Sequence, residues 1–164
     1  MKKIGIFMIL ICSFLLVSGC EKKETEKKEK KEEETEIINP LTEVSTKQEL
    51  EDMVGFSVPT IEEKEIITYI AIGNTGSKDQ ARILYQDGSE FDMKKGKVKD
   101  QEEISGIYGA EKKDSEKIEE TKVDFYTYEE TTFAVWSDED YTYSYSMQNT
   151  DIEVLKDNIK LLVK

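Results

Sequence analysis

The sequence predicts an α+β domain: an antiparallel meander sheet with a short N-terminal helix and a C-terminal helix packed on one face. Three observations lead to this fold class. Helix-capping signals stand near both ends of the folding part, at residues 46–49 and 150–153. Runs of β-branched and aromatic residues lie between them, separated by residues that favour turns. The last three runs follow one another closely, which is typical of consecutive antiparallel strands.

The first helix is predicted from a capping box, Thr46-Lys47-Gln48-Glu49, in which the threonine caps the helix and Glu49 bonds back to it. Leu50, Met53 and Val54 then fall on one helical face. Gly55 is expected to end the helix, because glycine tolerates the left-handed conformation of a C-terminal cap.

The middle of the chain is expected to alternate between strands and polar connections. The first strand covers residues 66–72 and leads into turn residues at 73–76. Residues 81–85 and 89–93 flank Asp87-Gly88, a dipeptide typical of tight hairpins in which both turn residues have positive φ. Residues 94–103 are expected to be a polar loop, residues 104–109 a short strand or bend, and residues 111–122 an exposed polar loop.

Three strands and a helix are predicted at the end of the chain. The strands are expected at residues 123–128, 131–136 and 141–147. Thr150 and Glu153 have the spacing of a second capping box. The apolar stripe of the helix that follows is made by Ile152, Leu155, Ile159 and Leu162.

The N-terminus has the pattern of an export signal that ends in a cysteine. Residues 1–3 are positively charged overall, residues 4–17 are almost wholly apolar, and small residues lead to Cys20. The stretch Val17-Ser18-Gly19-Cys20 resembles the lipobox of bacterial lipoproteins, which implies a diacylglyceryl group on Cys20 and cleavage before it. The apolar run is shorter than the roughly 20 residues that span a bilayer. A plain signal peptide is the remaining alternative.

The chain is therefore expected to have three parts: a lipoprotein signal peptide (1–19), a lipidated cysteine with a charged tether (20–36) and a single domain (37–164). Residues 21–36 contain eight Glu, six Lys and no apolar residue, so we expect an unfolded tether. The expected location is the outer face of the cytoplasmic membrane, contacted through the lipid. The domain has 28 acidic and 15 basic residues, a net charge of −13, which excludes nucleic acid as a partner.

The composition also limits the chemistry. Histidine is absent, which excludes catalytic triads and metal sites that use it. No cofactor and no metal are predicted. The cluster Asp138-Glu139-Asp140 could suggest calcium, but three adjacent acids supply too few spaced oxygens, so a polar hairpin turn is favoured.

No enzymatic activity is predicted. Ser105-Gly106 lacks the flanking glycines of a nucleophile elbow. A hydrolase that uses paired carboxylates is the weaker alternative, because 28 acidic residues always supply some pair and none is singled out.

Short motifs spread over residues 46–163 resemble an uncharacterised α+β domain family of exported and lipid-anchored proteins of Gram-positive bacteria. The motifs are Gly55-Phe56-x-Val58-Pro59, Arg82-Ile83-Leu84-Tyr85, Ile104-Ser105-Gly106-x-Tyr108, and Ala134-x-Trp136 with Tyr145. The segment Met93-Lys94-Lys95 departs from the pattern, where an arginine would be expected. The resemblance implies export and a compact α+β domain, and it implies no catalytic residue.

Four aromatic residues form the candidate ligand platform: Trp136, Tyr141, Tyr143 and Tyr145. The three tyrosines alternate with small polar residues, so they share one face of a strand, and Trp136 is expected to face the same way. The alternative to a platform is core packing, and Trp136 in particular is predicted to be an inward-facing anchor of the sheet.

Two functions remain open. The first is a lipid-anchored, non-enzymatic protein of the cell envelope that binds another protein or a cell-wall polymer. The second is a carrier or sensor that holds a small apolar ligand between a curved sheet and its helices.

Overall fold

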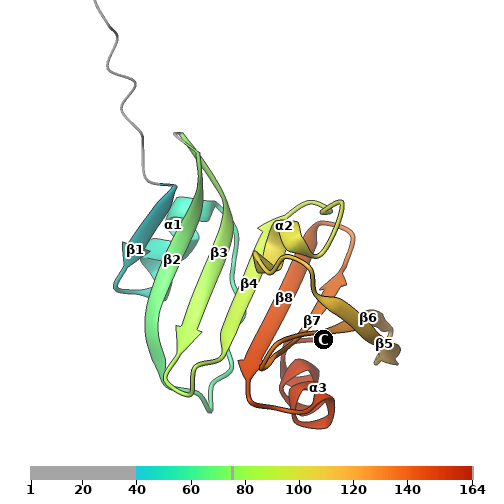
Figure 1. Cartoon of the computed structure of the whole chain (residues 1–164). Coiled ribbons are helices and arrows are strands. Elements are labelled where there is room, and N and C mark those ends of the chain that lie inside the picture. Colours follow the sequence, from blue (N-terminus) through green and yellow to red (C-terminus); the bar gives the residue numbers. More distant parts are fainter. Residues whose placement is uncertain (1–39, 75, 164) are drawn as a thin grey trace, which may run out of the picture. The chain divides into compact units, whose positions relative to one another are not determined.

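The computed structural model describes residues 40–74 and 76–163, which form one compact unit (Figure 1). The predicted signal peptide, Cys20 and the charged tether lie outside these residues. No helix in this described part of the chain is long and apolar enough to span a membrane.

An eight-stranded antiparallel sheet forms the body of this unit, in the order β1-β2-β3-β4-β8-β7-β6-β5. The strands are β1 Leu41–Val44, β2 Ile66–Asn74, β3 Ser77–Tyr85, β4 Glu90–Lys95, β5 Glu111–Ile118, β6 Thr121–Tyr128, β7 Thr131–Ser137 and β8 Tyr141–Gln148. The helices are α1 Lys47–Val54, α2 Glu102–Ser105 and α3 Ile152–Leu162. The predicted α+β class with an antiparallel sheet is confirmed. The sheet consists of two four-stranded meanders, β1–β4 and β5–β8, that meet where β4 pairs with β8 (Figure 1).

One face of the sheet supplies most of the buried apolar side chains. Residues directly opposite one another in neighbouring strands point to the same side. The pairs Ile83–Phe91, Phe91–Tyr145 and Tyr145–Ala134 therefore share one face across four strands. This surface, called the core face below, consists of Ala71, Ala81, Ile83, Tyr85, Phe91, Met93, Val123, Phe125, Ala134, Trp136 and Tyr145.

The two longer helices add to the same cluster of buried residues. Leu50 and Val54 of α1 belong to it, as do Leu155, Ile159 and Leu162 of α3. Helix α1 contacts β2 and β3, whereas α3 contacts β7 and β8. Complete burial of a leucine such as Leu50 or Leu155 contributes about 1.5–3 kcal/mol, so both helices are held mainly by this apolar contact.

Helix α1 begins and ends as predicted. Thr46 Oγ1 accepts a hydrogen bond from the Glu49 amide at 3.2 Å, and the Glu49 carboxylate accepts one from the Thr46 amide at 3.2 Å. Gly55 ends the helix with φ +77°. The prediction was wrong for Met53, which is 44 % exposed, because a surface hollow beside β1 lies next to its side chain.

The hairpin at Asp87-Gly88 is present, but its turn differs from the predicted one. Only Gly88 has a positive φ, at +80°. The Gly88 amide donates to the Tyr85 carbonyl at 3.0 Å, and the Tyr85 amide donates to the Ser89 carbonyl at 2.9 Å. This is a three-residue loop, in which a type I turn is followed by a left-handed glycine.

Three local predictions are corrected by the structure. Residues 111–122, expected as a loop, form strand β5, the turn at residues 119–120 and the first two residues of β6. Residues 104–109 hold the end of α2 rather than a strand, and Gly106 terminates that helix with φ +69°. Helix α3 is capped by Asp151, whose side chain accepts from the Val154 amide at 3.1 Å, and not by Thr150. The Thr150 carbonyl instead accepts from the Thr132 hydroxyl at 2.6 Å.

Candidate functional site

The four predicted platform residues all lie on the side of the sheet that forms the core face. Trp136 pairs with Tyr143 across β7 and β8, and Tyr141 and Tyr145 are two residues away from Tyr143 along β8. Trp136 is 5 % exposed and Tyr145 is completely buried, whereas Tyr141 and Tyr143 are half-buried. The predicted burial of Trp136 is thus confirmed, and only the two half-buried tyrosines and the edge of the indole can reach a ligand.

The rings of Trp136, Tyr141 and Tyr143 form a connected set of aromatic contacts at the end of β7 and the start of β8. The Trp136 and Tyr143 ring centroids are 5.4 Å apart, with the planes 12° from parallel. Phe91 lies within 6.4 Å of both rings, and Tyr141 lies 5.1 Å from Phe56. Such aromatic pairs contribute about 0.5–1.5 kcal/mol beyond the area they bury, so the stack is fixed in place before any ligand arrives.

The acidic turn at residues 138–140 orients this stack. Asp138 Oδ1 accepts from the amides of Asp140 and Tyr141, at 2.9 and 2.8 Å, and Oδ2 accepts from the Tyr143 hydroxyl at 2.5 Å. Burial would raise the pKa of Asp138, but the bonds from Tyr143 and the backbone outweigh it and lower the pKa. Burial and the Asp138 bond raise the pKa of Tyr143. The predicted polar turn is therefore present, and the Asp138 carboxylate stabilises it by accepting these hydrogen bonds.

A shallow surface hollow of about 270 Å³ lies against the stack and is called the aromatic hollow below. It is lined by Pro59, Thr121, Trp136, Asp138, Tyr143, Leu162 and Val163. The lining combines ring surfaces and apolar side chains with one carboxylate, which suits a sugar ring or an apolar side chain of a partner. Within residues 40–74 and 76–163, no three acidic side chains converge as metal ligands would.

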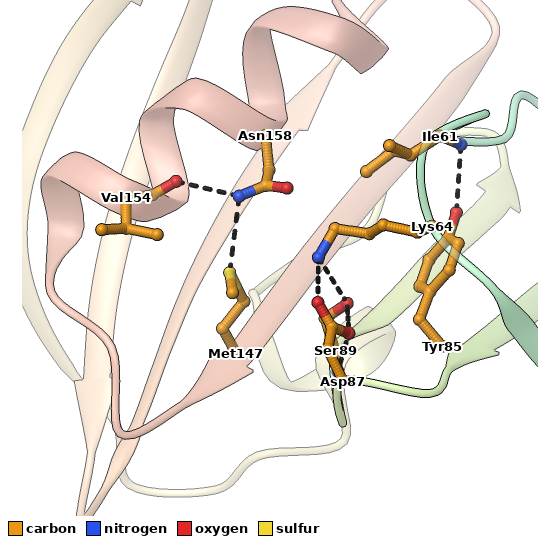
Figure 2. Close-up of polar contacts among 8 residues, drawn as sticks. All are labelled: Ile61, Lys64, Tyr85, Asp87, Ser89, Met147, Val154 and Asn158. Carbon is orange, nitrogen blue, oxygen red and sulfur yellow. Dashed lines mark hydrogen bonds and ion pairs between the residues drawn. The ribbon is translucent and has the colours of Figure 1, made fainter.

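A second polar cluster lies at the other end of β8, where the segment before β2 crosses the sheet (Figure 2). Lys64 Nζ donates to the Asp87 carboxylate, and to Ser89 Oγ at 3.3 Å. Its ammonium also lies 5.9 Å from the ring centroids of both Tyr85 and Tyr145. The Tyr85 hydroxyl accepts from the Ile61 amide at 3.3 Å, which ties the same segment to β3 (Figure 2).

This cluster contains a serine beside a lysine but lacks the electrostatics of a Ser–Lys dyad. Burial would lower the pKa of Lys64, but the Asp87 carboxylate and the nearby Tyr145 hydroxyl outweigh it and raise the pKa. The Ser89 hydroxyl donates to Asp87 at 2.6 Å and is itself buried. Lys64 is therefore held as a cation that braces the segment before β2, rather than as a base. Nearby, the Asn158 side chain joins α3 to β8 by donating to the Met147 sulfur at 3.7 Å (Figure 2).

A third cluster, which the sequence reasoning missed, lies on the opposite face of the sheet. Arg82 Nε lies 2.9 Å from Asp92 Oδ1 and 3.0 Å from Glu90 Oε1. Gln80 Nε2 donates to Asp92 at 2.8 Å and to the Ile104 carbonyl of α2 at 3.2 Å. Burial raises the pKa of Asp92 to about 8, opposed by the Arg82 charge and supported by the neighbouring carboxylate of Glu90.

The register of the β3–β4 hairpin could have revealed this cluster. Positions 82 and 92 are equally distant from Asp87, the centre of the predicted turn, and the structure pairs them directly. Arg82 is also the only arginine of the sequence. The sequence therefore contained a signal for this cluster: a basic and an acidic residue at opposed positions of a predicted hairpin.

The chain was compared with models of protein families, with curated proteins and with solved structures, and none of them matches it. The resemblance of its short motifs to a lipoprotein domain family therefore stays a prediction.

Proposed function

We propose that this protein is lipid-anchored through Cys20 on the outer face of the cytoplasmic membrane and binds a protein or a cell-wall component of the envelope without catalysing a reaction. The observation that carries the proposal is the aromatic hollow, where the half-buried ring of Tyr143, stacked on the buried Trp136, faces solvent between α3 and the β7–β8 turn. A fixed aromatic surface with one carboxylate at its rim suits recognition, since its rings lose little freedom on binding.

The packing supports binding at the surface more than storage of a ligand inside the domain. A carrier needs an apolar cavity under Trp136, but Phe91 and Tyr143 pack there against the indole ring. We also propose that α1 and α3 cover the same face of the sheet, since their buried residues belong to one cluster with the core face. A ligand would then meet this face only at its rim.

The charge of the domain narrows the class of partner. Its net charge of −13 repels polyanions and anionic lipid head groups, so that the tether would hold the domain above the membrane rather than on it. A neutral glycan, a peptide or a basic protein surface meets no such repulsion.

Trp136 is the only tryptophan, so its fluorescence reports directly on the aromatic hollow. Soluble peptidoglycan fragments, or an envelope protein cross-linked to the intact lipoprotein, should change its emission in a saturable manner. Thr121→Arg, which places a long side chain at the hollow, should weaken that binding at least tenfold, whereas Thr131→Arg at the far end of β7 should not. If both variants bind every such partner as the natural chain does, the hollow is not the binding site.

The anchor has its own test. Cells that express the chain and are fed a radioactive fatty acid should label it, and Cys20→Ala should remove the label completely, because the thiol is the atom expected to be acylated. Ser18→Ala serves as the control that keeps the cysteine. Label retained by the Cys20 variant would contradict lipidation at this residue.

A further inference from the structure

We propose that the aromatic hollow binds an extended basic segment of a partner protein, which inserts an apolar side chain into the hollow and places basic side chains against the carboxylates beside it. This inference rests on the proposed function and names the partner chemistry of the same site. A second hollow of about 330 Å³, called the acidic hollow below, shares Thr121 and Val163 with the aromatic hollow. Its other lining residues are Glu119 and Glu120.

The two hollows adjoin because two turns lie side by side at one end of the sheet. Val123 of β6 pairs with Trp136 of β7. Two residues beyond this pair, Thr121 begins β6, and Asp138 begins the turn that follows β7. Neighbouring strands lie about 4.8 Å apart. The strand pairing therefore brings the β5–β6 turn, which holds the two glutamates, next to the β7–β8 turn that orients the aromatic rings.

Two of the carboxylates at this site lack a positive partner. Glu120 pairs with Lys117 at 2.6 Å, whereas neither Glu119 nor Asp138 forms an ion pair in the described part of the chain. Asp138 accepts three hydrogen bonds, which leaves one of the roughly four acceptor positions of a carboxylate. No lysine or arginine is among the described residues that line the two hollows. A basic partner would therefore supply the missing positive charge.

The size of the aromatic hollow favours one side chain of a segment over a whole small molecule. Its volume of about 270 Å³ is below the range of about 300–1,000 Å³ that is usual for small-molecule pockets. In an extended segment, alternate side chains point to the same side about 6–7 Å apart, so basic side chains can flank the inserted apolar one. A neutral glycan would leave both carboxylates without a counter-charge. A second copy of this chain is a poorer occupant, because its domain also has a net charge of −13.

The test uses the full chain in non-ionic detergent and an end-blocked pentapeptide with lysine at both ends, leucine at the centre and serine between them. We expect a saturable change of Trp136 emission, with affinity that falls several-fold between about 50 and 300 mM salt. Glu119→Lys should weaken binding at least fivefold. Its matched control is Glu129→Lys, which changes the net charge equally and should weaken binding less than twofold. Glu129 stands in the turn at the other end of β6 and has the same φ of +52° as Glu119.

Failure of this inference can be told apart from failure of the proposed function. The inference is wrong if the peptide does not bind, or if Glu119→Lys and Glu129→Lys bind it equally well. Binding of peptidoglycan fragments that Thr121→Arg weakens would then leave the proposed function in place. Peptide binding that Thr121→Arg leaves unchanged would contradict both, because the ligand would lie elsewhere. Tighter peptide binding by Lys164→Ala would mean that the end of the chain itself competes for the site, and it would overturn the inference of a partner segment.

Discussion

Replacing Trp136 by alanine should lower the free energy of unfolding by about 3–5 kcal/mol. The indole is 5 % exposed and stacks on Tyr143 and Phe91, so its removal leaves a void at the rim of the core face. The cost is a large part of the roughly 5–15 kcal/mol that a domain has in total. Denaturant unfolding followed by circular dichroism measures it without the tryptophan signal.

Tyr108→Ala is the matched control, because this aromatic residue is 71 % exposed and its removal should change the free energy of unfolding by no more than about 0.5 kcal/mol. A cost for Trp136→Ala as small as that of the control would mean that the ring is dispensable for folding. Trp136 would then have to be regarded as a ligand contact alone.

The second large effect concerns Asp92 and the dependence of stability on pH. The raised pKa means that the folded protein keeps a proton on Asp92 where the unfolded chain, with a usual value near about 4, has released it. The contribution is complete below about pH 4 and is lost as pH rises through about 8, so the free energy of unfolding falls as pH rises over this range. Arg82 and Glu90 are the charged groups in contact with Asp92, and both stay in place in the test.

Asp92→Asn keeps an oxygen for Arg82 and Gln80 but has no proton to bind or release. Between pH 5 and 9, the free energy of unfolding of the natural chain, measured with denaturant, should therefore fall relative to that of the variant as pH rises. Asp100→Asn, at an exposed aspartate, should run parallel to the natural chain. Parallel curves for Asp92→Asn would mean that the carboxyl is already ionised throughout this range.

The elements that could be predicted from the sequence are those with a complete local signal. The capping box at Thr46, the glycine that ends α1 and the apolar stripe of α3 each lie within a single helix and its caps. Asp87-Gly88 likewise identified a hairpin, although not its turn type. The burial of Trp136 followed from its apolar neighbours in the strand.

The missed elements lack such a signal because tertiary contacts define them. Strand β5 has exposed side chains at all positions except Ile118, so it shows no apolar alternation and looks like a loop. Strand β1 has only four residues, and α2 is a single turn. The hydrogen-bonded cluster of Arg82 and Asp92 depends on register across a hairpin, which a reading of each strand by itself does not consider.

The division of the sheet into two meanders has a consequence for how the chain folds. Within each meander, neighbouring strands are close in sequence and their hairpins need only short loop closures. The pairing of β4 with β8 is different, because Lys95 and its partner Tyr141 are separated in the sequence by all of β5, β6 and β7. Long-range pairing of this kind is slow to form, so the β4–β8 junction is the step expected to limit the folding rate. We therefore expect each meander to form early as a local unit and the two meanders to pair with each other late.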